Sequence, residues 1–318
     1  MRSAKSSRPC VADGRAVSAM APRRHGRLAK DERVFAVLLV APALIVLFAT
    51  TTGPLIYLVW TSLHQANLSM PWMSGFVGLE HFAYMLADDR FWQSLRLTAI
   101  YTTTTVALQL MIGLALALVV LRIPANQWLF RLAAILPIVL APVVVGLYWR
   151  TLMLSPSFGL LDVFTTQVLG RSYNWLGDPS LALASVILIH TWQWTPFAFL
   201  VLLASLAAVP PDLYEAARID RAGAIARFRY ITLPLIRPAI MIVVIMRAVI
   251  ALSAFAAIYA ATGGGPGTAT QILNLYAYQT SFVALDFGYG SALAVALLVV
   301  TLAVSALLFR LRRRRGLA

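Results

Sequence analysis

The side chains that could carry chemistry concentrate in one charged segment of an otherwise apolar chain. Val209–Pro238 reads VPPDLYEAARIDRAGAIARFRYITLPLIRP. Asp212 follows two prolines and Glu215 stands three residues later, a spacing that predicts a capped helix start. The predicted helix would carry a small apolar face and remain cationic overall. Such a helix between two apolar blocks either receives a soluble partner or lies on the lipid surface.

No pattern in the sequence indicates catalysis or metal binding. The run Gly263–Gly267 resembles a phosphate-binding loop but lacks the terminal G-K-[ST] of such loops. The four histidines have no metal-binding spacing, and we expect His190 to be a packed core residue. Cys10 is the only cysteine, so no internal disulfide can form. We therefore expect no catalytic residue, no metal site and no enzymatic activity in this chain.

A second group of polar residues lies within the apolar blocks. Arg247 stands in the middle of one block, where a charge is costly and usually faces the bundle interior or a wet cavity. Pairing with backbone carbonyls and contact with a transported solute explain it about equally well. Aromatic, amide and hydroxyl groups suit a neutral polyhydroxylated solute, although Trp and Tyr are equally typical of membrane-interface anchors. With Arg247, the candidate path residues are Trp192, Gln193, Trp194, Ser253, Phe255, Tyr259 and Asn274.

The elements that must position these residues are long apolar blocks. Hydrophobic residues make up 60% of the 318, charged residues only 12%, and the mean hydropathy is +0.80. Six blocks reach the roughly 20 residues that a helix needs to cross a bilayer. The sequence predicts an all-α membrane protein with six transmembrane helices and a cytoplasmic loop, 209–238, between spans four and five. The spans are Val34–Trp60, Ser94–Leu121, Leu129–Leu152, Leu181–Ala207, Ala239–Ala260 and Gly290–Phe309.

Arginine and lysine fix the predicted orientation. They cluster before the first block, within Val209–Pro238 and after the last block, whereas the opposite loops hold few of them. Because cationic loops stay on the cytoplasmic side, both termini are predicted to be cytoplasmic. This distribution explains the net charge of +14 without nucleic acid. The predicted domains are a disordered basic tail over 1–33, a six-span domain over 34–309 and a basic tail over 310–318.

The segment Val209–Pro238 resembles the EAA loop of permease subunits from binding-protein-dependent ABC importers. That loop follows the pattern E-A-A, three residues, G, nine residues, I-x-L-P, and Glu215, Ala216, Ala217, Asp220, Ile231, Leu233 and Pro234 fall in register with it. Arg221 stands where the family usually has glycine, and Gly223 follows two positions on. The resemblance implies a coupling helix seated on an ATPase, with Glu215 making the main polar contact. The implied coupling residues are Glu215, Ala216, Ala217, Asp220, Arg221, Gly223, Leu233 and Pro234.

A second resemblance is to the carbohydrate-uptake branch of these permeases. It rests on Thr262–Phe282 (TGGGPGTATQILNLYAYQTSF), on Phe287–Leu293 and on Trp192–Phe197. The family implies a multi-pass permease of a bacterial inner membrane that imports a sugar or polyol. Its implied partners are the lipid bilayer, a second permease subunit in a heterodimer, two cytoplasmic ATPase subunits and an extracytoplasmic solute-binding protein. ATP and Mg would be bound by the ATPases, and this chain would hold no cofactor.

Two alternatives stay open at this point. An ion-coupled secondary transporter would be expected to carry intramembrane carboxylates and inverted repeats, and the six predicted spans contain no Asp or Glu. The other alternative is an ABC permease for a non-carbohydrate solute. The residues alone do not identify the solute.

Overall fold

The computed structural model describes residues 30–70, 72, 74–122, 132 and 135–314. Most of the two predicted tails, 1–29 and 315–318, lies outside these residues. The chain divides into two compact units, 1–54 and 55–318. In the first unit, the described residues belong to helix α1 (Lys30–Ser62), whose stretch Val37–Ser62 is long and apolar enough to cross a membrane.

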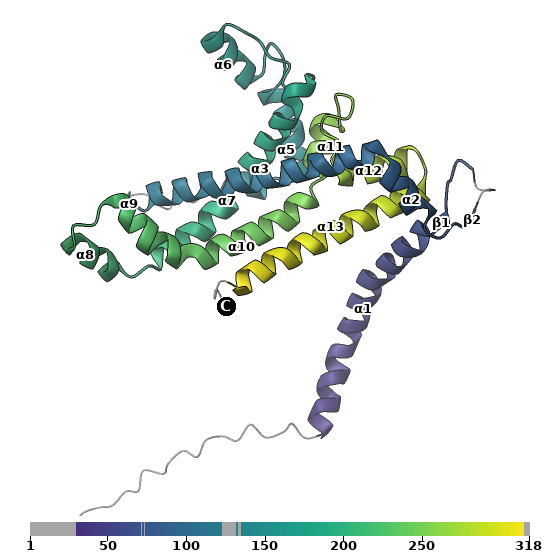
Figure 1. The fold of residues 1–318 in the computed structure, drawn as a ribbon, viewed down its shortest axis with the longest axis horizontal. Coiled ribbons are helices and arrows are strands. Elements are labelled where there is room, and N and C mark those ends of the chain that lie inside the picture. The colour runs from purple at the N-terminus through teal and green to yellow at the C-terminus, as the bar shows by residue number, and fades with distance from the viewer. Residues whose placement is uncertain (1–29, 71, 73, 123–131, 133–134, 315–318) are drawn as a thin grey trace, which may run out of the picture. The chain divides into compact units, whose positions relative to one another are not determined.

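Four more helices among the described residues can span a membrane. They are α3 (Asp89–Val120), α7 (Pro179–Ala207), α10 (Leu233–Leu252) with the turns that precede it, and α13 (Phe287–Arg314). Helix α3 packs along α7, and α10 contacts α3, α7 and α13, so these four lie side by side (Figure 1). The chain is therefore a helical membrane protein, with long helices at the first, second, fourth, fifth and sixth predicted spans.

The third predicted span, Leu129–Leu152, falls partly outside the described residues, at 129–131 and 133–134. Its described part comprises a helical turn at 135–139, α5 (Pro142–Tyr148) and the π-helical turn η2 (Trp149–Met153). The chain leaves helical geometry at Leu140 and Ala141. Pro142 explains the break, because proline disfavours helix at the residue before it and favours the first turn of a new helix. The six-span count thus stays a prediction.

The fifth predicted span, Ala239–Ala260, has wrong boundaries. Helix α10 already begins at Leu233, ends at Leu252, and is followed after a short break by α11 (Ala256–Thr262). Helical geometry in fact runs without a break from Ala224 through a π-helical turn (Phe228–Thr232) into α10, so Pro234 lies inside the span. The wider π-helical turn directly before it accommodates a residue that has no amide hydrogen. The break at Ser253–Phe255 contains neither proline nor glycine, so no local sequence signal marked it.

Shorter elements complete the second unit. Helices α2 (Glu80–Ala87), α6 (Leu160–Leu169) and α12 (Leu273–Tyr278), with the π-helical turn η4 (Gln279–Val283), lie between the long helices. Strands β1 (His64–Gln65) and β2 (Gly75–Phe76) pair antiparallel. The all-helical prediction did not include this two-residue hairpin, which is too short to show a strand pattern in the sequence.

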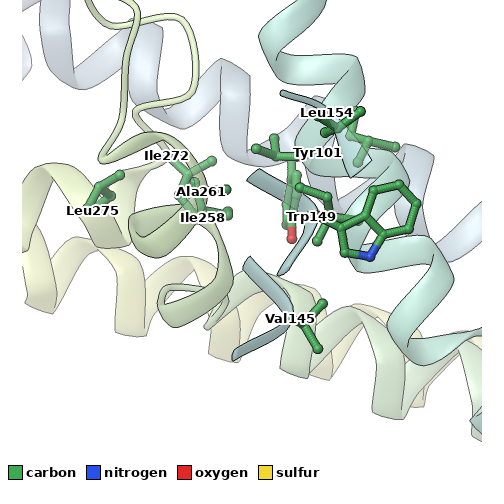
Figure 2. Close-up of a cluster of buried hydrophobic side chains, with 11 residues drawn as sticks. Tyr101, Val145, Trp149, Leu154, Ile258, Ala261, Ile272 and Leu275 are labelled. Atoms are coloured by element: carbon green, nitrogen blue, oxygen red, sulfur yellow. The ribbon is translucent and has the colours of Figure 1, made fainter. Parts of the chain in front are cut away.

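Two of the buried clusters join α3, α7 and α10 to their neighbours. The first gathers residues of α3, α5, α7, α11 and α12 around Tyr101, Trp149 and Ile258 (Figure 2). The second joins the C-terminal halves of α3 and α7 to α10. In the second, α3 approaches α7 closely at Gly113, where a Cβ would lie 2.9 Å from both the Ala198 Cβ and the Phe199 backbone nitrogen. Small residues permit such close helix packing in a membrane, where apolar burial alone does not drive association.

Candidate functional site

Arg247 is the centre of a polar cluster inside the bundle. Its side chain is fully buried. The guanidinium donates from Nε to the Gln109 Oε1 at 2.8 Å and from Nη2 to the His190 Nε2 at 3.0 Å, and it lies 4.4 Å from the centre of the Trp194 ring. Because a guanidinium has only donors, the His190 Nε2 must accept, which places the imidazole hydrogen on Nδ1. The cluster ties α10 to α3 and α7 through side chains rather than backbone carbonyls.

A cavity of about 350 Å³, called here the α10 cavity, adjoins this cluster. His190 and Trp194 belong to its wall, so Arg247 lies directly behind two of its lining residues. Gln193 also lines it, donating from Nε2 to the Leu140 carbonyl at 3.1 Å while its Oε1 has no partner among the described residues. The Gln193 side chain is completely buried, so this unpaired acceptor lies behind the cavity surface and could meet a hydroxyl group only after the wall moves.

The structure separates the predicted path residues into two sets. Gln193, Trp194, Ser253 and Phe255 line the α10 cavity. The other set lies elsewhere: Arg247 is buried behind the wall, Trp192 packs on Trp149, and Tyr259 stacks on Phe255. Asn274 donates from Nδ2 to the Ser253 carbonyl at 3.1 Å, so it fastens α12 to the break that follows α10. The break thus brings Ser253 and Phe255 to the cavity.

The second candidate site is the loop 209–238. It forms α8 (Pro211–Ile219), the short α9 (Ala224–Arg227), the π-helical turn η3 (Phe228–Thr232) and the start of α10. Ala217 is buried, and the Tyr214 hydroxyl pairs with the Thr232 Oγ1 at 2.9 Å, which holds α8 against η3. Glu215 is exposed, and Ile219 and Ile225 are each 83% exposed. The loop therefore presents an acidic and an apolar surface outward.

The predicted capping box at the start of α8 does not form. The helix begins at Pro211, with Pro210 as the capping residue and no hydrogen bond from a capping side chain. Proline at this position is already set for a helical first turn, so the start needs no capping side chain. Asp212 then lies within the first turn, where its charge is favourable near the positive end of the helix.

Arg221 lies in the left-handed region, with a φ of 55°. This is the position at which the EAA pattern has glycine. Residues other than glycine reach this conformation at a cost because their Cβ approaches the following carbonyl oxygen. Gly223, in contrast, has an ordinary φ of −66°. The turn between α8 and α9 is therefore built as the pattern requires, with arginine in the strained position.

One continuous helical path joins the two candidate sites. The span that includes α10 runs from Ala224 to Leu252. It begins inside the 209–238 loop, passes Arg247 and ends at Ser253 in the wall of the α10 cavity. The loop and the cavity wall are therefore parts of one continuous helical segment.

At the opposite end of the bundle, Asp88 joins three elements. Its Oδ2 accepts hydrogen bonds from the hydroxyls of Tyr276 and Tyr289, each at 2.6 Å, and its Oδ1 accepts from the Arg90 backbone amide at 2.9 Å. Burial raises the pKa of this carboxyl, but these hydrogen bonds outweigh burial and hold the pKa below its ordinary value. Asp88 therefore fastens the start of α3 to α12 and α13 as an anion.

Comparison with known proteins identifies the family. Residues 109–316 match the family described as binding-protein-dependent transport system inner membrane component. The chain belongs to this family. It is thus a non-catalytic permease subunit of an ABC importer and a multi-pass inner membrane protein. The permease works in a complex with a binding protein and with ATPases that bind ATP. Membership of this family excludes the alternative that the chain is an ion-coupled secondary transporter.

Curated relatives of this permease match over most of its length. The sulfoquinovosyl glycerol transport system permease protein SmoG of Agrobacterium fabrum is 36% identical, covering 92% of this chain and 95% of that protein. The trehalose/maltose transport system permease protein MalF of Thermococcus litoralis is 34% identical, covering 87% and 93%. The sn-glycerol-3-phosphate transport system permease protein UgpA of Agrobacterium fabrum is 31% identical, covering 89% and 96%.

A solved structure shares the fold of the permease. It is the crystal structure of a bacterial ABC transporter involved in the import of the acidic polysaccharide alginate, with a TM-score of 0.75 and 22% identity. The match covers 89% of this chain and 96% of that chain. At this level of identity the match shows the arrangement of helices and not the solute.

Sequence reasoning missed two parts of the site. Gln109 is the only amide side chain in the second predicted span, a signal that could have marked it as a partner of Arg247. His190 is buried, as predicted for a core residue, but its bond to Arg247 depends on the packing of α7 against α10. No spacing along the chain shows that contact.

Proposed function

We propose that this permease moves a sugar, a polyol or a related glycoside through the α10 cavity, powered by ATPases that grip the 209–238 loop. In this proposal it pairs with a second, similar permease in a heterodimer, two ATPase subunits bind on the cytoplasmic side with Mg-ATP, and an extracytoplasmic protein delivers the solute. Both termini and the loop face the cytoplasm. The observation that carries the proposal is the helix from Ala224 to Leu252, which connects the loop to the cavity wall.

The chemistry of the α10 cavity supports a polyhydroxylated solute. Trp194 and Phe255 offer aromatic faces on which a sugar ring can stack, and the unpaired Gln193 Oε1 offers a hydrogen-bond acceptor once the wall moves. None of the described lining residues is acidic, and the one basic residue among them, His190, uses its Nε2 to accept from Arg247. Relatives whose names specify trehalose/maltose or sulfoquinovosyl glycerol as the cargo point to the same class.

The outward surface of the loop supports a docked ATPase. Glu215 is exposed on α8 without a hydrogen-bond partner among the described residues. Ile219 at the end of α8 and Ile225 on α9 are also exposed. Closure of the ATPases is expected to push this surface as a rigid body and to rock α10. The proposed coupling residues are the exposed Glu215, Ala216, Asp220, Arg221 and Gly223, the buried Ala217, and Leu233 and Pro234 at the start of α10.

A coupling test compares two acidic residues on the same helix. In the assembled transporter in vesicles, Glu215→Ala should separate ATP hydrolysis from uptake or release the ATPases, because it removes the proposed polar contact. Asp212→Ala, which also removes an exposed carboxylate from α8, should change uptake less than twofold. Uptake by the Glu215 variant at the wild-type rate would contradict the role of this residue.

A cavity test separates the solute path from the coupling. Gln193→Leu removes the free acceptor while keeping a side chain of similar size. We expect solute-stimulated ATP hydrolysis to need at least about tenfold more solute-loaded binding protein, while basal hydrolysis and the amount of bound ATPase stay unchanged. If ATP hydrolysis in this variant depends on solute as it does in wild type, the solute does not pass through the α10 cavity.

A further inference from the structure

A second, larger cavity lies at the loop end of the bundle. It encloses about 910 Å³ and is called here the arginine cavity. Arg122 enters it from the end of α3, Arg218 from α8 and Arg227 from the end of α9. None of its described lining residues is acidic. Three cations that converge without a carboxylate among them make the cavity attractive to an anion.

The surroundings of Arg227 show that the wall of the cavity is fixed by burial and hydrogen bonds. Its side chain is half-buried, and its Nε is buried with no hydrogen-bond partner among the described residues. Thr232, itself buried, donates to the Arg227 carbonyl at 3.4 Å and pairs with the Tyr214 hydroxyl, so the backbone that carries Arg227 is held against α8. A buried unpaired donor is costly, and an anionic oxygen at this point would remove the cost.

The remaining walls are apolar and belong to membrane helices. Leu118 and Leu121 come from the end of α3, and Leu206 from the end of α7. The spans of these two helices end at Val120 and Ala207, and the next span begins at Ala224. The arginine cavity therefore adjoins the ends of three candidate spans, where lipid headgroups are expected.

We propose that the arginine cavity binds an anionic phospholipid, with the headgroup phosphate on Arg227 and Arg218 and the upper acyl chain along Leu118 and Leu206. Guanidinium groups match phosphate oxygens in pairs of parallel hydrogen bonds, and juxtamembrane cations attract anionic lipids. A free phosphate shares the headgroup chemistry but leaves the apolar wall uncovered. The bound lipid would fill the space between α8 and the membrane helices and fix the position of the loop. This inference does not depend on the identity of the solute.

The test measures lipids retained by the whole transporter, purified with its partner subunits in detergent and depleted of lipid. Native mass spectrometry follows the binding of added phosphatidylglycerol and phosphatidylcholine in separate titrations, and inorganic phosphate is then added to the phosphatidylglycerol-bound transporter. Arg227→Gln removes the donor with the unpaired Nε. Arg229→Gln removes the same charge from an exposed neighbour that does not line the cavity.

Wild type should bind phosphatidylglycerol in preference to phosphatidylcholine, and inorganic phosphate should not displace it. Arg227→Gln should weaken phosphatidylglycerol binding at least about tenfold, the loss expected for a charge-assisted hydrogen bond, and Arg229→Gln should leave it unchanged. Should Arg227→Gln prevent assembly, Arg218→Gln serves as the second variant, because its exposed side chain contributes little to folding. An equal loss in Arg229→Gln, equal binding of both lipids, or displacement by phosphate alone would overturn the proposal.

Discussion

Helix α10 connects a region in which a charged side chain is buried to a region in which apolar side chains are exposed. Near its C-terminal end, Arg247 is completely buried inside the bundle. Before its N-terminal end, Ile219 and Ile225 in the 209–238 loop are each 83% exposed. The first region buries a charge inside the helix bundle, and the second exposes apolar side chains at the loop end of the same span.

The two arrangements have different physical consequences. Arg247 is tolerable because Gln109, His190 and Trp194 surround it, and these contacts contribute to holding three helices together. Its buried Nη1 has no hydrogen-bond partner among the described residues. Among the described residues, the hydrophobic clusters include neither of these exposed isoleucines, and such surfaces usually serve association. Substitutions in the first region should therefore damage the subunit itself, whereas those in the second should damage its assembly.

The largest effect is expected for Arg247→Ala. The change leaves the Gln109 Oε1 and the His190 Nε2 without their partner and opens a void, and together these should lower the stability of the subunit by about 3–5 kcal/mol. Thermal unfolding of the assembled transporter in detergent measures the loss. Arg237→Ala is the matched control, because Arg237 lies on the same helix but is only partly buried. Equal melting temperatures for wild type and Arg247→Ala would show that the cluster does not hold the helices.

Gly113→Ala tests the packing of the same region without touching a charge. The new Cβ would meet the Ala198 Cβ and the Phe199 backbone nitrogen at 2.9 Å, so α3 and α7 must separate. We expect a loss of about 1–3 kcal/mol, typical of overpacking, from the same melting experiment. Gly53→Ala in α1, where nothing lies within 4 Å of the added Cβ, is the control and should not destabilise. A melting temperature of Gly113→Ala at or above that of wild type would exclude close packing there.

The contrast also explains what the sequence could predict. Continuous apolar blocks predicted α1, α3, α7 and α13 because membrane helices must satisfy their backbone within one segment. The pattern around Glu215 located the loop. The break at Ser253–Phe255 and the partners of Arg247 depend on contacts between helices, which leave no periodicity along the chain. Half of the predicted path residues consequently lie away from the cavity that the other half lines.

Arg221→Gly tests the backbone conformation of the exposed 209–238 loop. Arg221 adopts a φ of 55°, and glycine reaches this conformation without the steric cost, so the variant should gain about 1 kcal/mol in local stability. Hydrogen exchange of the α8–α9 turn in the assembled transporter measures the gain as slower amide exchange. Gly223→Ala, at an ordinary φ of −66° with open space around it, should leave exchange in the turn nearly unchanged. Faster exchange in the Arg221 variant would mean that the arginine side chain makes a stabilising contact that outweighs the strain.

The smallest effect on the stability of the subunit is expected for Ile219→Ser. Because its side chain is 83% exposed, the change should alter the free energy of unfolding by less than about 0.5 kcal/mol. If an ATPase covers this residue, however, the same change removes apolar contact from an interface, and the ATPase should dissociate more readily during purification. Leu302→Ser is the matched control, since Leu302 is 61% exposed but lies in the α13 span, where lipid rather than a soluble subunit covers it. Retention of the ATPase should therefore fall in the Ile219 variant and not in the Leu302 variant. Equal retention in both would show that the apolar surface of the loop faces lipid, which is the amphipathic alternative for this helix.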